Sequence, residues 1–230
     1  MNWFTNFLTS SIGQKLSMSL TGLFLISFLP VHLIGNLQLL IADGGETFNL
    51  YAQFMTTNPL VKTISYGLYA FILLHAVQGL LLWRKNSQAK GGKYAVKATR
   101  ATGTSAGLAK NMGILGTIVL LFIIVHMGQF WFKMKIGDVP MEVYDGAEVK
   151  NLYAPVRAAF TNIFYVLFYV VSMFFIGLHL KHGFQSAFQT LGLNHSKYTP
   201  LIKTLGNLYA IFVPLGFAII PIIFYVRNLN

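Results

Sequence analysis

Residues 161–181, TNIFYVLFYVVSMFFIGLHLK, decide the fold, because they are apolar over nearly their whole length and contain no Asp or Glu. An α-helix of about 20 such residues spans the hydrocarbon core of a bilayer. The chain has five runs of this kind, at about 16–41, 62–83, 112–133, 161–181 and 204–226. They lack the polar–apolar alternation of β-barrel strands. The sequence therefore predicts an all-α, five-transmembrane-helix bundle in which residues 1–230 form a single integral membrane domain.

The composition agrees with a membrane protein and excludes several classes of function. Of the 230 residues, 55% are hydrophobic and only 10% are charged, against about 25% charged in soluble domains. The chain has no cysteine, which excludes disulfides, thiolate-bound iron–sulfur clusters and covalent haem attachment. The net charge of +11 comes from basic residues between the spans, without a nucleic-acid-binding motif. We therefore expect no nucleic-acid partner.

Acidic and basic residues fall in different loops. All six acidic residues follow the first or the third span, at Asp43, Glu46, Asp138, Glu142, Asp145 and Glu148. The loop after the second span has only basic charges, at Arg84, Lys85, Lys90, Lys93, Lys97, Arg100 and Lys110. Lys and Arg mark the cytoplasmic side of a membrane. The pattern predicts a cytoplasmic N-terminus and an outside C-terminus, although Lys133, Lys135, Lys150 and Arg157 run against it.

The two kinds of loop also differ in what they are expected to do. Residues 46–59, ETFNLYAQFMTTNP, have helical spacing and are expected to form a short interfacial helix that stops at Pro59. Residues 87–107 are rich in Gly, Ala, Thr and basic residues. They form either a flexible cytoplasmic linker or a docking surface for an acidic partner.

Histidines provide the main functional signal. Five of the six lie in or at the ends of the spans, at 32, 75, 126, 179 and 182. Ionisable residues inside a span indicate function, although one such histidine often serves only as an interhelical hydrogen-bonding group. With the predicted topology, His32 and His126 fall in the outer half of the membrane, and His75 and His179 in the inner half. Two pairs at two levels are what two stacked bis-histidine haems require.

Other uses of these histidines agree less well with the pattern. A structural zinc site needs four ligands at one point, whereas these lie at two levels. A proton relay normally includes Asp or Glu, and none lies within a span, so electron transfer is favoured over ion pumping. Pro30, Pro214 and Pro221 interrupt the first and fifth spans. Discontinuous helices would favour a transporter, but no paired repeat accompanies them.

Two histidines compete for one role in residues 177–184, GLHLKHGF. His179 directly follows the apolar run, whereas His182 follows Lys181 and lies nearer the headgroups. Gly183 follows His179 by one turn, as Gly79 follows His75. We therefore predict that His179 is the iron ligand and that His182 contacts a haem propionate or the interface.

Several stretches of the chain together resemble one family. They are SMSLTGLFL (17–25) ahead of His32, FNLYAQFMTTNP (48–59), HAVQG (75–79), Gly116 ten residues before His126, and His179 followed by Gly183 and Gly192. In this order they resemble the single-chain, di-haem cytochrome b subunit of succinate:quinone oxidoreductases, the succinate dehydrogenase and fumarate reductase complexes. The resemblance covers nearly the whole chain.

This resemblance implies a membrane-anchor and electron-transfer subunit in a bacterial inner membrane. Two b haems would relay electrons between an iron–sulfur subunit and membrane quinone, with menaquinone favoured over ubiquinone. His75 and His179 would hold the proximal haem, and His32 and His126 the distal one. A flavoprotein subunit beside the iron–sulfur subunit on the cytoplasmic face would carry the succinate chemistry, because this chain has no flavin or nucleotide motif.

Further site residues are expected around the haems. Ser19 matches a family serine near the haem propionates, and Lys93 and Arg100 of the basic loop are physical candidates for the same contact. A quinone needs hydrogen-bond donors and a proton source, and the polar residues that follow the first span are candidates: Asn36, Gln38, Asp43, Glu46, Asn49 and Gln53. The alternative role for each is solvation at the interface.

Two alternatives to this function remain open. The chain could be the cytochrome b subunit of another quinone-linked dehydrogenase or hydrogenase, which shares the haem arrangement but has a different partner. It could also be a haem-free membrane anchor whose histidines form hydrogen bonds between helices.

Overall fold

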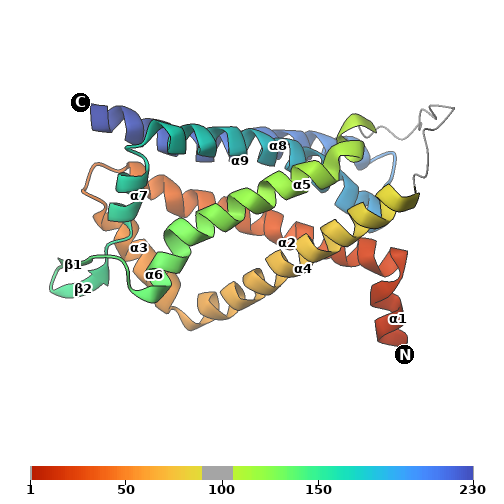
Figure 1. The fold of residues 1–230 in the computed structure, drawn as a ribbon, viewed down its shortest axis with the longest axis horizontal. Coiled ribbons are helices and arrows are strands. Elements are labelled where there is room, and N and C mark those ends of the chain that lie inside the picture. The colour runs from red at the N-terminus through yellow and green to blue at the C-terminus, as the bar shows by residue number, and fades with distance from the viewer. Residues whose placement is uncertain (1, 90–105, 230) are drawn as a thin grey trace.

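A computed structural model describes residues 2–89 and 106–229, and helices make up most of them (Figure 1). Five helices are long: α2 (Ser11–Leu37), α4 (Pro59–Ala89), α5 (Ala106–His126), α8 (Ile163–Thr190) and α9 (Thr199–Leu229). Five stretches are long and apolar enough to cross a membrane: Ser11–Leu40, Pro59–Gln88, Asn111–Ile136, Ile163–Thr190 and Thr199–Leu229. The prediction of five apolar spanning helices is therefore confirmed, although most of them run several residues beyond the expected limits.

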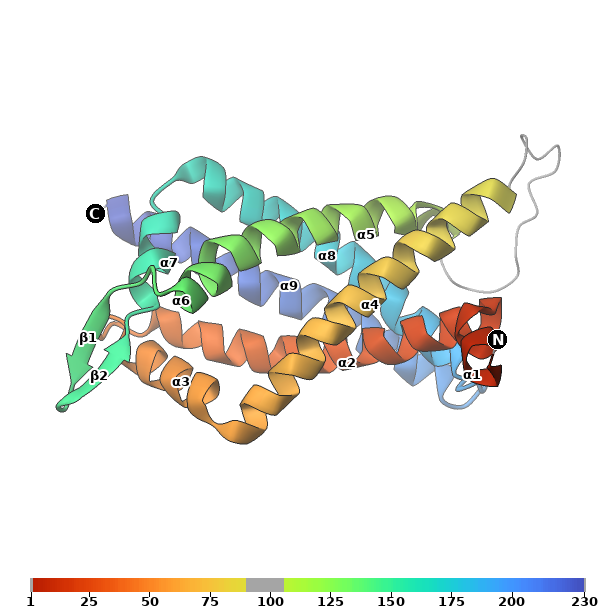
Figure 2. The same cartoon turned by 60° about the horizontal axis from the view of Figure 1, so that its bottom comes forward.

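Four of the long helices form a ring. Neighbours around the ring are α2 with α4, α4 with α5, α5 with α8, and α8 with α2, while α9 packs outside against α8 and α2. Figure 2 shows α4 running obliquely across the bundle, in front of α2. The two chain termini lie at opposite ends of the bundle (Figures 1 and 2), as an odd number of passes requires. Which end is cytoplasmic stays a prediction from the charges.

Prolines do not interrupt the helices, contrary to the expectation. Pro30 lies inside α2, and Pro214 and Pro221 lie inside α9. A proline lacks the N–H that would bind the carbonyl four residues earlier, which for Pro30 is the carbonyl of Ile26. The Tyr209 hydroxyl on α9 donates to that oxygen at 2.5 Å. The helix continues through Pro30 because a neighbouring helix supplies the missing donor.

The end of the bundle near the C-terminus carries smaller elements. They are η1 (Gln38–Leu40), α3 (Glu46–Thr57), α6 (Lys133–Ile136), α7 (Tyr153–Ala159) and the antiparallel strands β1 (Met141–Tyr144) and β2 (Ala147–Lys150). The expected short helix at 46–59 is confirmed as α3. The mostly helical fold agrees with the all-α prediction, to which the structure adds a short hairpin in residues 141–150, with Tyr144 paired to Ala147.

Asn49 of α3 joins these elements. It is 0% exposed. Its amide nitrogen donates to the Tyr144 hydroxyl at 3.0 Å and to Asn151 Oδ1 at 3.2 Å. Its oxygen accepts from the backbone N–H groups of Leu152 and Tyr153 at 2.9 and 3.0 Å. The side chain is thus fully used in holding α3, the hairpin and the start of α7 together, which removes it from the quinone candidates.

Candidate functional site

The first histidine pair joins α2 to α5. The ring centroids of His32 and His126 are 5.9 Å apart, with an angle of 85° between the ring planes. Phe28 stacks on His32, and Phe122 stacks on His126. Each phenylalanine lies one helical turn before its histidine, on the same face of the helix. The two phenylalanine rings make the surroundings of the pair mostly apolar.

The second pair joins α4 to α8. The ring centroids of His75 and His179 are 6.3 Å apart, with an angle of 71° between the planes. No ring contact of this kind joins His75 to His182 in the described part of the chain. The geometry therefore supports His179 rather than His182 as the partner of His75.

Both pairs cross the ring of helices diagonally. In the described residues, no extensive backbone packing joins α2 to α5 or α4 to α8. These helices face each other across the bundle, and the histidines extend into the space between them. A cofactor held by either pair would thus lie in the core of a four-helix bundle, where such sites are built.

The two pairs lie at different heights along the bundle. Thr21 and Gly22 of α2 contact His75, and Gly22 precedes His32 by ten residues. Gly116 of α5 lies next to His179 and precedes His126 by ten residues. Ten residues of α-helix rise about 15 Å, so two helices independently give the same separation. The two levels expected from the sequence are therefore present in the fold.

The same ten-residue spacing occurs on a third helix, α8, at a residue that the sequence did not indicate. Tyr169 of α8 precedes His179 by ten residues, and its hydroxyl lies 3.1 Å from His126 Nδ1. Tyr169 is buried, at 6% exposure. It belongs to a buried apolar cluster built mainly from α5, α7, α8 and α9, with Phe122, Val166, Met173, Ala218 and Phe224 among its members.

A hydrogen bond between Thr21 and His75 orients the His75 ring. The Thr21 hydroxyl donates to the Ser17 carbonyl at 2.8 Å, so toward His75 Nδ1, at 3.2 Å, it acts as an acceptor. With the Thr21 proton directed to Ser17, His75 can carry its own proton on Nδ1, which leaves Nε2 free. That is the form in which an imidazole binds metal through Nε2, with a partner orienting the other nitrogen.

His32 has a different neighbour. The Asn36 amide nitrogen donates to the His32 carbonyl at 2.7 Å and lies 3.2 Å from His32 Nδ1. In this arrangement Nδ1 accepts and Nε2 holds the proton. Metal binding through Nε2 would require Asn36 to turn away. Asn36, expected to contact quinone, is thus a direct neighbour of a proposed ligand.

The spacing of the rings at both levels fits a metal held between two imidazoles. Metal–imidazole bonds of about 2 Å separate the two ring centroids by roughly 6 Å, close to both observed values. A Cβ at Gly22 would come 3.2 Å from His75 Cε1, so a side chain there would crowd the ring. His179 Nδ1 and Gln78 Oε1 are buried without a hydrogen-bond partner, which indicates an incomplete polar environment at this level.

A stretch of π-helix follows the proposed ligand on α5. His126 is the last residue of α5, and η2 (Met127–Phe132) has π geometry. Such wide turns occur often at functional sites. Within this stretch, Trp131 Nε1 donates to the Tyr69 hydroxyl of α4 at 2.7 Å. The hydrogen bond ties α4 to the π-helix just beyond the His32–His126 pair.

The residues predicted to contact the haem propionates lie in different surroundings. The Ser19 hydroxyl is buried and donates to the Lys15 carbonyl at 2.9 Å, so its proton is already used within α2. His182 is half-buried on α8. Lys93 and Arg100 lie outside the described residues.

The remaining quinone candidates gather near the end of α2 and along α3. Gln38 lies in η1, and Glu46 and Gln53 lie in α3. The Asp43 carboxylate accepts from the backbone N–H groups of Gly45 and Thr47, each at 2.9 Å. Hydrogen bonding from Thr47 holds the pKa of Asp43 below its usual range, which makes it a poorer proton donor. Its main observed role is to fix the turn before α3.

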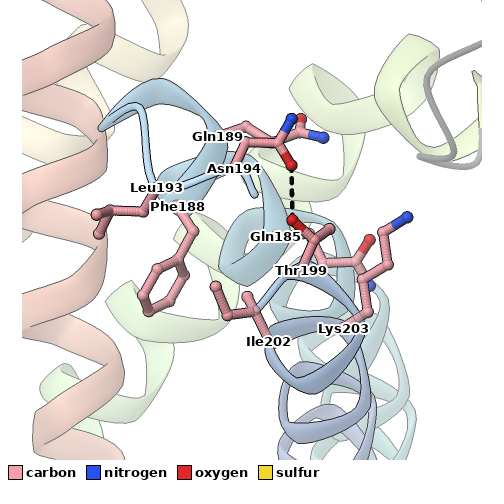
Figure 3. A pocket seen from close by; sticks show the side chains of 8 residues that line it. All are labelled: Gln185, Phe188, Gln189, Leu193, Asn194, Thr199, Ile202 and Lys203. Atoms are coloured by element: carbon pink, nitrogen blue, oxygen red, sulfur yellow. Dashed lines mark hydrogen bonds between the residues drawn. The ribbon is translucent and has the colours of Figure 1, made fainter. Parts of the chain in front are cut away.

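A shallow pocket lies at the other end of the bundle, where α8 turns into α9 (Figure 3). Its lining includes Gln185, Phe188, Gln189, Leu193, Asn194, Thr199, Ile202 and Lys203. The Thr199 hydroxyl donates to Asn194 Oδ1 at 2.8 Å and fixes the start of α9. None of the predicted site residues lines this pocket.

No family model, curated protein or solved structure matches the chain. In the described residues, no three His, Asp or Glu side chains gather where they could share one metal ion. The functional assignment therefore rests on the two histidine pairs and on the resemblance in sequence.

Proposed function

We propose that this chain is the membrane-anchor and electron-transfer subunit, a cytochrome b, of a succinate dehydrogenase or fumarate reductase complex. The observation that carries the proposal is the pairing of His32 with His126 and of His75 with His179. The pairs cross opposite diagonals of one four-helix ring, about 15 Å apart by helical rise. A bis-histidine haem at each level would form a relay along the bundle.

The protein's part in this relay is to hold and orient the ligands. The Thr21 hydroxyl can accept from His75 Nδ1, and the Tyr169 hydroxyl can accept from His126 Nδ1. When bound, haem supplies the one-electron chemistry. Partners of this kind strengthen the ligand and set its direction, so the chain itself influences which level holds the electron more tightly.

The identity of the partners rests on the resemblance. An iron–sulfur subunit and a flavoprotein would dock at the end that carries the N-terminus and the basic loop, and quinone would react at this subunit, with menaquinone favoured over ubiquinone. The described basic side chains at that end include Lys15, Arg84 and Lys85, all exposed. A positive surface there favours an acidic partner.

Purification of the chain from its native membrane, with its partners attached, tests the proposal. We expect an iron–sulfur protein and a flavoprotein to copurify, and succinate to reduce the b haems in optical spectra. Reduction by another donor and not by succinate would move the chain to a different quinone-linked dehydrogenase or hydrogenase. A chain without haem would contradict the proposal in both forms.

A further inference from the structure

The first helix, α1 (Trp3–Thr9), has two different faces. Trp3 and Phe7 stack along one side, with ring centroids 6.0 Å apart. At about 100° per residue, Thr5 and Thr9 lie on the opposite side, next to Asn2 and Asn6. Trp3 is 80% exposed, and Ile12 at the start of α2 is 77% exposed. An amphipathic segment with an exposed tryptophan on its aromatic face therefore precedes the first spanning helix.

An ordered turn, here called the elbow, joins α1 to α2 at residues 10–13. The Ser10 hydroxyl donates to the Phe7 carbonyl at 2.6 Å and accepts from the Gly13 N–H at 3.0 Å. A Cβ at Gly13 would lie 1.9 Å from the Phe7 carbonyl oxygen, so only glycine permits this close approach. Figures 1 and 2 show α1 turned away from the long axis of the bundle. The elbow sets the direction of α1 relative to the spanning helices.

The surroundings of the elbow are basic. Lys15, Arg84 and Lys85 are exposed at this end, and Lys85 Nζ donates to Gln14 Oε1 at 2.9 Å, which ties α4 to α2. All six acidic residues of the chain lie in the loops at the opposite end. Anionic lipid headgroups attract basic residues at a membrane surface, and tryptophan and phenylalanine favour the boundary between headgroups and acyl chains.

We propose that α1 lies in the membrane interface at the basic end, with Trp3 and Phe7 inserted among lipids. Lipid is the occupant that fits best, because α1 directly precedes α2, a helix that is long and apolar enough to span a bilayer and that carries exposed apolar side chains such as Ile12 and Leu20. The elbow would then hold the start of the first span at a fixed depth. This inference needs the chain to be in a membrane and does not depend on haem.

The absence of native cysteine makes the test direct. Trp3→Cys and Thr5→Cys would each carry a nitroxide label on the full chain, in bilayers of phosphatidylcholine and phosphatidylglycerol. Both positions are exposed, so the lipid or water around them decides the result. We expect the label at position 3 to collide more with oxygen, which enriches in lipid, and the label at position 5 to collide more with a water-soluble nickel chelate.

Equal and high accessibility to the nickel chelate at both positions would overturn the proposal, because α1 would then lie in water. Low accessibility to both reagents at position 3 would also overturn it, because protein would cover that face.

A second variant tests the elbow in the Trp3→Cys background. Gly13→Ala should make the label at position 3 more mobile and remove its preference for oxygen. The matched control is Gly67→Ala, since a Cβ at Gly67 meets nothing within 4 Å. An unchanged signal in Gly13→Ala would show that the elbow does not hold α1 in the interface. If Gly13→Ala fails to fold, the comparison of positions 3 and 5 still decides where α1 lies.

Discussion

Individual side chains decide how each level of the bundle would work. The Nδ1 surroundings differ among the four paired histidines: a threonine lies at His75, a tyrosine at His126 and an asparagine at His32, whereas Nδ1 of His179 has no hydrogen-bond partner. Ligand orientation and basicity depend on such neighbours. The two levels are therefore chemically unequal even though each is built from two histidines.

Removal of one ligand should affect one level only. We expect His75→Ala to lose the haem of the His75–His179 pair and to retain the other, because the pairs are about 15 Å apart along the helices. Reduced-minus-oxidised spectra and haem quantification measure this. His182→Ala is the matched control and should keep both haems. Loss of the same haem in His182→Ala as well would mean that His182 is the ligand on α8.

Tyr169 should tune the His32–His126 level without holding it. Tyr169→Phe removes the acceptor at His126 Nδ1, which makes the imidazole a weaker donor to ferric iron. A hydrogen bond contributes about 1 kcal/mol, so the midpoint potential of this haem should rise by tens of millivolts. Redox titration measures the shift. Tyr198→Phe is the control, because Tyr198 is 56% exposed and directly precedes α9, at the other end of the bundle. Equal potentials in Tyr169→Phe and the unmodified protein would exclude this role.

Two helix contacts lie where a proline leaves a carbonyl oxygen without its helical hydrogen-bond donor. The hydroxyl of Tyr209 replaces the N–H that Pro30 lacks in α2. At the contact of α8 with α9, a Cβ at Gly177 would lie 2.9 Å from the Ala210 carbonyl, which is the carbonyl that Pro214 leaves without its helical donor. The contacts at Pro30 and Pro214 thus fix the packing of α2, α8 and α9 near the histidines.

Loss of the Tyr209 hydroxyl should destabilise the bundle. Tyr209→Phe leaves the Ile26 carbonyl without a donor, at a cost of about 1–3 kcal/mol for an unsatisfied buried polar group. Denaturant-induced unfolding in detergent micelles measures the change in free energy. Tyr66→Phe, at a ring that is 60% exposed, should have little effect. A Tyr209→Phe variant as stable as the unmodified protein would mean that water or another group satisfies Ile26.

For the whole molecule, local periodicity and length predict the spans, and the topology that the charges indicate predicts the depth of each histidine within its span. Features that depend on tertiary contacts were not predictable in this way. The approach of Tyr169 to His126 requires knowing that α5 packs on α8, and the role of Asn49 requires the folded loops. The hairpin has a signal in the sequence, because the Asp-Gly dipeptide at 145–146 favours a two-residue turn. In the structure both residues have positive φ, at 51° and 80°.

The count of b haems on the purified full chain tests the account most directly. A pyridine haemochrome assay, together with reduced-minus-oxidised spectra, should give about two b haems per chain, one for each histidine pair. Zero haem would contradict the haem assignment altogether and would favour a membrane anchor whose histidines only join helices. One haem per chain would contradict the two-level arrangement on which the proposed electron relay depends.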